Sequence, residues 1–165
     1  MTQNKKLFIG VLGHQNSGKS WTWNGLFGRV VGSSRTRLRS LMLECDHPSE
    51  KRRLTLENLF LVYGSPEERN TKLEKIIGDT DPDIVLCSMQ YLEGAKDSLY
   101  WANENGFEII VLWLNPGYDT TSYKDELGFE GITNQLNGTF EKINGKHESD
   151  ERAAHVAKAI CNAMK

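Results

Sequence analysis

Several features that mark common protein classes are missing from this chain of 165 residues. No apolar run approaches the roughly 20 residues of a membrane-spanning helix, and residues 1–6 lead into the first apolar segment without the apolar core of a signal peptide. The three cysteines, Cys45, Cys87 and Cys161, are widely spaced and form no C-x-x-C or Cys/His zinc pattern. We therefore expect a cytoplasmic protein with no membrane partner, no zinc site and reduced cysteines in its core.

Net charge is also small, at −2, but its distribution is uneven. Residues 29–53 carry seven basic and three acidic side chains, a balance of +4, so the rest of the chain sums to −6. A basic patch on an acidic protein is typical of a binding surface for an anionic second substrate. The length predicts a single domain over residues 1–165, without linkers or repeats.

One motif stands out against this background, a G-x-x-x-x-G-K-[ST] segment directly after an apolar run over residues 7–12. In such a P-loop, backbone N–H groups surround a triphosphate, the lysine reaches the outer phosphates and the hydroxyl ligates Mg²⁺. We expect Lys19 and Ser20 to have these two roles. The predicted phosphate-binding residues are Gly13, His14, Gln15, Asn16, Ser17, Gly18, Lys19, Ser20 and the adjoining Trp21.

The order of apolar patterns predicts the fold. Strand-like runs over residues 41–46, 83–89 and 107–114 follow the first strand, and helical spacing occurs from residue 19 to about 27, over 94–105 and from 149 onward. Helical spacing over 51–63 and a capping box at 65–68 predict two further helices. Alternating strands and helices after a P-loop indicate a three-layer α/β/α sandwich with a mainly parallel, doubly wound sheet.

Trp21 and Asp46 each allow two interpretations. Trp21 lies about 200° around its helix from the buried Trp23 stripe, so it either flanks the nucleotide or is covered by a neighbouring loop. Asp46 ends the second strand, and ligands gather at the carboxyl ends of strands in open α/β sheets. The third strand ends in Ser88-Met89-Gln90 without an acid, which favours Asp46 as the Mg²⁺ or acceptor acid over a role as N-cap.

Arginines flank the second strand on both sides. If residues 35–39 are extended, their guanidinium groups share one side and either bind phosphates of an acceptor or form the solvated face of an edge strand. The predicted acceptor-binding residues are Arg35, Arg37, Arg39, Arg52 and Arg53.

Residues 117–148 are polar and rich in glycine and asparagine. Such a stretch is either a lid over the phosphates or a surface loop without function. It contains no arginine, and Lys124 is the nearest substitute for one.

With the Gly13–Ser20 loop, the Asp46 strand end and the run over 83–116, the chain resembles the P-loop NTPases, and most of all the small nucleoside and nucleotide kinases. This resemblance implies transfer of the γ-phosphoryl group of ATP, or of GTP, to a nucleotide-like or nucleic-acid acceptor, with Mg²⁺ as cofactor. Lys19 and Asp46 would then be catalytic, and Ser20 and Asp46 would hold the metal.

Two alternatives remain open. Asn16-Ser17-Gly18-Lys19-Ser20 is similar to the N-x-G-K-S of several GTPases, which favours a nucleotide-dependent switch. Against it, the fourth strand ends in Asn115-Pro116-Gly117-Tyr118 where N-K-x-D would recognise guanine, and no D-x-x-G follows the third. The other alternative is a weakly hydrolysing or non-catalytic module that docks a partner through the arginine strand.

Overall fold

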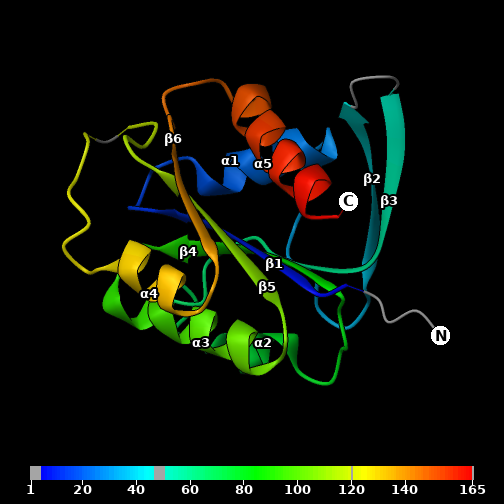
Figure 1. Ribbon diagram of the computed structural model, residues 1–165, viewed down its shortest axis with the longest axis horizontal. Coiled ribbons are helices and arrows are strands. Elements are labelled where there is room, and N and C mark those ends of the chain that lie inside the picture. The colour runs from blue at the N-terminus through cyan, green and yellow to red at the C-terminus, as the bar shows by residue number, and fades with distance from the viewer. Residues whose placement is uncertain (1–4, 47–50, 120, 165) are drawn as a thin grey trace.

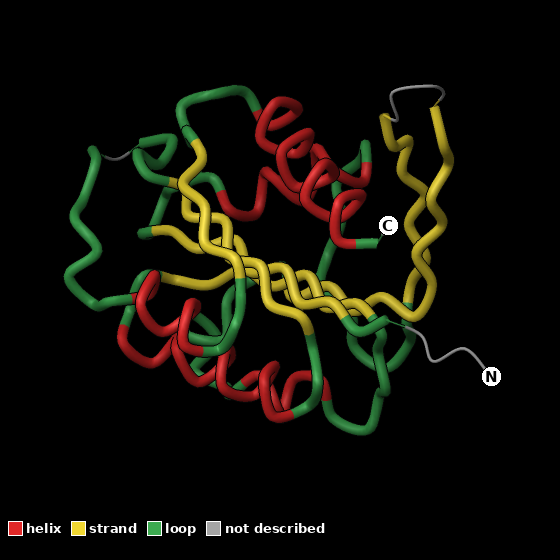
Figure 2. Tube along the Cα trace, viewed as in Figure 1, coloured by secondary structure: helices red, strands yellow, loops and turns green. Residues whose placement is uncertain are grey.

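A central, mostly parallel sheet with helices on both faces forms the molecule (Figures 1 and 2). The computed structural model describes residues 5–46, 51–119 and 121–164. The strands lie in the order β2-β3-β4-β1-β5-β6. Their bounds are Leu7–Gly13 (β1), Arg39–Asp46 (β2), Lys51–Val62 (β3), Ile84–Gln90 (β4), Glu108–Leu114 (β5) and Thr139–Ile143 (β6). The helices are Lys19–Phe27 (α1), Leu73–Ile77 (α2), Glu93–Ala95 (η1), Lys96–Glu104 (α3), Phe129–Gln135 (α4) and Ser149–Ala163 (α5).

The centre of the sheet confirms the predicted α/β architecture. β1 is paired in parallel with β4 on one side and with β5 on the other. All seven residues of β1 are buried, which explains its unbroken apolar sequence. Because Gly13 is level with Gln90 of β4, the loop after β1 begins at the carboxyl edge of the sheet, where parallel strands direct their connections and ligands.

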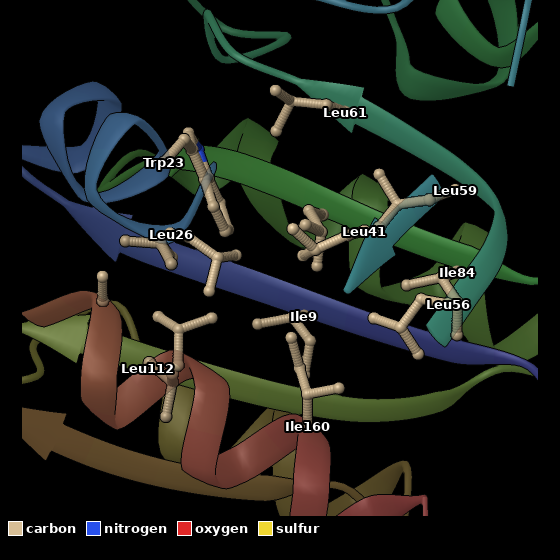
Figure 3. Packing of buried hydrophobic residues seen from close by; sticks show 14 of the residues in the cluster. Ile9, Trp23, Leu26, Leu41, Leu56, Leu59, Leu61, Ile84, Leu112 and Ile160 are labelled. Carbon is tan, nitrogen blue, oxygen red and sulfur yellow. The ribbon is translucent and has the colours of Figure 1, made fainter. Parts of the chain in front are cut away.

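Two apolar clusters hold the helices to the sheet. One contains Trp23 and Leu26 of α1 and Val156 and Ile160 of α5, and Figure 3 shows part of it. The other packs α2, α3 and α4 against the opposite face. The helical spacing predicted from residue 19 to about 27 and from 149 onward is thus confirmed by the buried residues of α1 and α5.

The prediction of a helix over residues 51–63 is wrong, because this segment is the long strand β3. The apolar residues of this segment fit a strand as well as a helix. Leu54 and Leu56 alternate with exposed neighbours, as in a strand with one buried face, and the run from Leu59 to Val62 is fully buried. A short run that is buried on both faces has no period of its own. Pairing with β4 therefore decides in favour of a strand.

The premise that β2 runs parallel to the other strands is also wrong. β2 and β3 form an antiparallel hairpin in which Asp46 is opposite Lys51 and Glu44 is opposite Arg53. Since β3 is parallel to β4 and β1, the carboxyl end of β2 lies at the amino end of β3. Figure 1 shows the outer half of this hairpin standing away from the sheet, beside the C-terminal end of α5.

Cys45 of β2 and Cys161 of α5 form a disulfide, so the prediction of three reduced cysteines is wrong. The two residues are 116 positions apart in the sequence, and only the folded hairpin brings them together. Cys87 of β4 is free and buried, as predicted, and burial raises the pKa of its thiol. None of the helices in the described ranges has the length and apolarity needed to cross a membrane. The cytoplasmic location stays a prediction.

Helix α1 and helix α5 approach each other closely at Gly25. A Cβ at this position would lie 2.7 Å from the carbonyl oxygen of Ser149 and 3.1 Å from the Cβ of Ala153. Gly25→Ala is therefore expected to lower the free energy of unfolding by about 1–2 kcal/mol, because overpacking costs more than the roughly 1 kcal/mol that alanine adds to a helix. Denaturant unfolding measures this difference.

The matched control is Gly131→Ala in α4, where no described atom lies within 4 Å of an added Cβ. That substitution is expected to raise stability by about 0.5–1 kcal/mol. If both variants were stabilised to the same extent, the close packing at Gly25 would be contradicted.

Candidate functional site

The P-loop has the backbone geometry that binding a phosphate requires. Asn16 and Gly18 have positive φ values of 64° and 95°, a conformation that turns successive N–H groups toward one point. A Cβ at Gly13 would lie 2.2 Å from Ser17 Oγ, so glycine is the only residue that this turn accommodates. The Ser17 side chain is itself buried, and its hydroxyl has no partner among the described residues.

Lys19, the first residue of α1, places its ammonium group over the loop. Its Nζ donates to the carbonyl oxygens of Gly13 at 3.1 Å and His14 at 2.9 Å. The side chain is 6% exposed. Burial lowers the pKa of Lys19, an effect that the nearby Glu68 and Glu67 oppose. The cation is thus held ready for a phosphate.

A cavity of about 700 Å³ opens beside the loop. Its walls come from the P-loop and α1, the turn after β3, the loop after β5 and the start of α5. The lining residues are Gln15, Asn16, Ser17, Gly18, Lys19, Ser20, Trp21, Glu68, Tyr118, Asp119, Glu148, Ser149 and Arg152. Six of the predicted phosphate-binding residues and Trp21 are therefore brought together.

The end of β3 lies directly beside Ser20. The hydroxyl of Ser20 donates to the carbonyl of Tyr63 at 3.3 Å, and Ser88 Oγ donates to the same oxygen at 2.7 Å. The turn that follows carries Glu67 and Glu68. Glu67 Oε1 accepts from the backbone N–H of Gln90 at 2.9 Å, and burial raises the pKa of this carboxyl.

Glu68, and not the predicted Asp46, lines the cavity together with Ser20. Its backbone N–H donates to Ser65 Oγ at 3.1 Å, as in the predicted cap, but the next α-helix in the chain, α2, begins only at Leu73. The signal in the sequence was two glutamates just after the apolar run over 59–63. Interpreting that run as a helix concealed the strand end, and with it the acid.

Ser20 and Glu68 fit a Mg²⁺ ion that is shared with a nucleotide. Both supply hard oxygen atoms to the same cavity. Within the described ranges, no group of three or more His, Cys, Asp or Glu side chains could hold a metal by itself. Magnesium is commonly bound by one or two protein oxygens together with phosphates and water, and this site has that composition.

The structure does not bring Asp46 to the P-loop. Asp46 ends β2 at the far end of the hairpin, next to the disulfide at Cys161. Helix α5 extends from the cavity at Ser149 to that disulfide, about 18 Å along its axis at 1.5 Å per residue. The sequence argument for Asp46 assumed that β2 is parallel to its neighbours. Because β2 is antiparallel to β3, that argument no longer supports a role for Asp46 at the P-loop.

The predicted acceptor arginines are also outside the cavity lining. Arg35 and Arg37 lie in an exposed bend before β2, and Arg39 begins that strand near Arg29. Arg52 and Arg53 are on the outer half of β3. The basic patch therefore lies on the hairpin and on the segment before it, outside the cavity lining.

Trp21 has the exposed position that its helical phase predicts. Its side chain is 64% exposed and lines the cavity, where Tyr118, 46% exposed, forms part of the opposite wall. That it contacts a nucleotide stays a prediction.

His14 differs from the other loop residues in being covered by aromatic rings. Its ring centroid lies 3.9 Å from that of Tyr123 and 4.9 Å from that of Tyr91. Its Nε2 atom is buried without a partner in the described structure. Burial and, secondarily, the charge of Lys19 lower its pKa, so neutral His14 packs as an aromatic residue.

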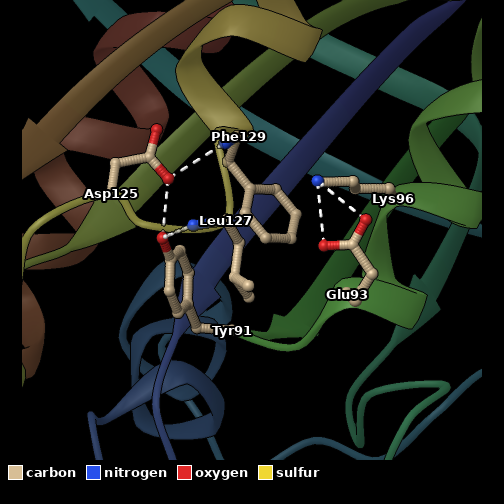
Figure 4. Close-up of polar contacts among 6 residues, drawn as sticks. All are labelled: Tyr91, Glu93, Lys96, Asp125, Leu127 and Phe129. Carbon is tan, nitrogen blue, oxygen red and sulfur yellow. Dashed lines mark hydrogen bonds and ion pairs between the residues drawn. The ribbon is translucent and has the colours of Figure 1, made fainter.

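The contacts of Tyr91 fasten part of residues 117–148 to the body of the protein. Tyr91 donates its hydroxyl proton to Asp125 at 2.6 Å and accepts from the N–H of Leu127 (Figure 4). Burial, with Asp125 as hydrogen-bond acceptor, raises the pKa of Tyr91 to about 12. Asn115 makes two hydrogen bonds to the backbone of Tyr123. This segment also contains α4 and β6, which the sequence did not indicate. A lid function stays a prediction.

Comparison with solved structures identifies the fold. The chain is similar to translation elongation factor SelB from Methanococcus maripaludis in complex with the GTP analogue GppNHp, with a TM-score of 0.53 and 15% sequence identity. The match covers 99% of this chain and 34% of that one, so this chain spans about a third of its length. No family model and no curated protein sequence matches the chain. The likeness shows a P-loop NTPase-like α/β fold.

Proposed function

We propose that this protein binds a nucleoside triphosphate with Mg²⁺ and hydrolyses its terminal phosphate, as a nucleotide-dependent switch. The observation that supports hydrolysis is the placement of Glu68 in the cavity of Lys19 and Ser20, while Asp46 and the five arginines of the predicted acceptor site lie outside it. Lys19 and Arg152 are the basic residues that line the cavity. An anionic acceptor would find no basic patch of its own there.

The residues divide the chemistry among them. The N–H of Ser17 donates to the carbonyl oxygen of His14 at 3.1 Å, so other N–H groups of the P-loop, together with the ammonium of Lys19, donate to the phosphates, where charge develops as the terminal bond breaks. Ser20 and Glu68 would hold Mg²⁺, which would neutralise phosphate charge when bound. Glu68 also orients the attacking water by accepting its hydrogen bond. Phosphoryl transfer requires mainly positioning and charge stabilisation, and a protein nucleophile is not needed.

The hydrogen-bond donors of guanine suit this cavity better than those of adenine. Asp119 and Tyr118 line the same wall, and their backbone N–H groups donate to the P-loop carbonyls of Asn16 at 3.3 Å and Ser17 at 2.9 Å. A carboxylate accepts two hydrogen bonds from adjacent donors, and guanine presents such a pair at N1 and N2 while adenine presents only N6. The SelB structure that resembles this chain holds a GTP analogue. We therefore propose GTP in place of the ATP that the sequence suggested.

The test is a label-transfer assay with γ-labelled GTP and, in parallel, ATP. It contains Mg²⁺ and pools of nucleosides, nucleotides and 5′-hydroxyl oligonucleotides, and it follows both free phosphate and labelled acceptor. We expect free phosphate alone, released faster from GTP. Label on any acceptor would establish the kinase alternative instead, and faster release from ATP would contradict the role of Asp119.

Glu68→Gln is expected to lower the hydrolysis rate by about a hundredfold or more, because an amide is a poor acceptor for the water and a weak magnesium ligand. Nucleotide affinity should change only a few-fold, since Lys19 and the loop remain. Single-turnover hydrolysis and equilibrium binding separate the two effects. Glu74→Gln, on the exposed face of α2, is the matched control and should retain the full rate.

A further inference from the structure

Arg152, in the first turn of α5, is a buried cation that has only neutral protein partners. It is 2% exposed. Its Nε donates to Thr22 Oγ1 at 3.1 Å, and its Nη1 donates to the carbonyl oxygens of Gly145 at 3.0 Å and His147 at 2.8 Å. Among the described residues, no carboxylate lies within ion-pair distance of it. A buried guanidinium with no carboxylate in direct contact is costly to the fold, since Glu148 acts on it only from beyond ion-pair distance, and this points to an anion supplied from outside.

The Nη2 edge of the guanidinium makes no hydrogen bond to any described residue, and Arg152 lines the nucleotide cavity. Gly18 of the P-loop lies against the guanidinium group, because an added Cβ there would lie 3.1 Å from Cζ and from Nη2 and 3.3 Å from Nη1. On its other side, the Arg152 Cζ atom is 5.6 Å from the centre of the Tyr118 ring. Since Gly18, Tyr118 and Arg152 all line the cavity, this edge lies between the P-loop and the wall assigned to the base.

The charges around the cavity leave Arg152 as the cation nearest that wall. Lys19 is held against Gly13 and His14 at the other end of the loop. The acids that line the cavity are Glu68, Asp119 and Glu148. Burial lowers the pKa of Arg152, and Tyr118 and Glu148 oppose this, but a guanidinium stays charged at neutral pH in any case.

We propose that Arg152 is a phosphate-binding residue, whose Nη2 edge donates to the phosphate nearest the nucleoside while Lys19 and the loop hold the outer phosphates. Through its other nitrogens the same side chain joins α1, the loop after β6 and α5 around the bound nucleotide. The inference rests on the proposed function only in requiring a nucleotide in this cavity. It does not require hydrolysis.

The experiment measures affinities of the wild-type chain and Arg152→Gln for the mono-, di- and triphosphates of guanosine by calorimetry, at several salt concentrations. Loss of a charge-assisted hydrogen bond is expected to weaken binding by roughly tenfold to a hundredfold. The ratio of wild-type to variant affinity should be similar for the mono-, di- and triphosphate, because all three contain the innermost phosphate. The salt dependence of the affinity should also become shallower. Arg152→Lys should retain the salt dependence and part of the affinity.

Thr22→Val is the matched control for packing, because it removes the Nε bond and leaves the guanidinium in place. Its melting temperature should fall without a comparable loss of affinity. The proposal is overturned if Arg152→Gln binds the nucleotides with the affinity and salt dependence of the wild type. It is also overturned if the variant binds the di- and triphosphate more weakly but the monophosphate with unchanged affinity. A wild-type chain that binds no guanosine nucleotide overturns this proposal together with the proposed function. Binding without hydrolysis overturns only the latter.

Discussion

Replacing Lys19 with alanine is expected to remove nearly all affinity for a nucleoside triphosphate while the fold stays intact. The ammonium group makes two hydrogen bonds to loop carbonyls at the point where the outer phosphates would lie. In the complex the ammonium would make charge-assisted contacts to phosphate oxygens, and two such contacts of about 1.5–3 kcal/mol each correspond to a loss of at least a hundredfold in affinity. Stability should change little, because loss of the two hydrogen bonds to the loop carbonyls is offset by removal of the desolvation cost of the buried ammonium.

Calorimetric titration with GTP and thermal unfolding without nucleotide measure the two quantities separately. Lys158→Ala is the control, since Lys158 is exposed on α5 and outside the cavity lining. An affinity for GTP within threefold of the wild type would exclude the P-loop as the triphosphate site. A large drop in melting temperature would show instead that Lys19 holds the loop together.

Reduction of the Cys45–Cys161 disulfide is expected to lower the free energy of unfolding by about 2–4 kcal/mol. The bridge joins residues that are 116 positions apart, so it restricts a large part of the unfolded chain. For a chain of this size, that corresponds to a fall in melting temperature of very roughly 5–15 °C. Denaturant and thermal unfolding, with and without dithiothreitol, test this directly.

The control is the double variant Cys45→Ser, Cys161→Ser, whose stability should match that of the reduced wild type and should not respond to dithiothreitol. Cys87 is buried in β4, so in native protein a thiol reagent should react slowly even after reduction of the bridge. If three thiols titrate in unfolded, unreduced protein, the disulfide is absent and the expected shift disappears.

The sequence predicts the centre of the fold well because each element there carries its own pattern. The P-loop, the buried strands β4 and β5 and the amphipathic α5 all occur where hydrophobic periodicity and capping residues place them. The hairpin was missed for a physical reason. The direction of β3 is set by its parallel pairing with β4, and β2 then runs antiparallel to β3. This pairing joins segments that are distant in sequence, and no local pattern predicts it.

The candidate site shows the same difference between residues in a local motif and residues brought in by contacts between distant segments. The predicted phosphate-binding residues form one contiguous motif, and those from Gln15 to Trp21 line one cavity. That they bind phosphate stays a prediction. Glu68 and Arg152 reach the cavity from the turn after β3 and from the start of α5. The signal for Glu68 was hidden by the interpretation of residues 51–63 as a helix, and nothing in the sequence around Arg152 indicated its place. Asp46 was assigned by the rule that strand carboxyl ends meet at one edge, a rule that fails for an antiparallel strand.

The close contact of α1 with α5 also determines which part of the protein can move. Gly25 lies against Ser149, Thr22 is bonded to Arg152, and Cys161 is covalently attached to the hairpin. These three attachments join both helices and the hairpin to one another. Under the proposed function, we therefore expect rearrangement between nucleotide states in residues 64–72, the helix-free segment that carries Glu68 and leads to the short α2. A partner that senses the nucleotide state would have to read the α2 side of the molecule.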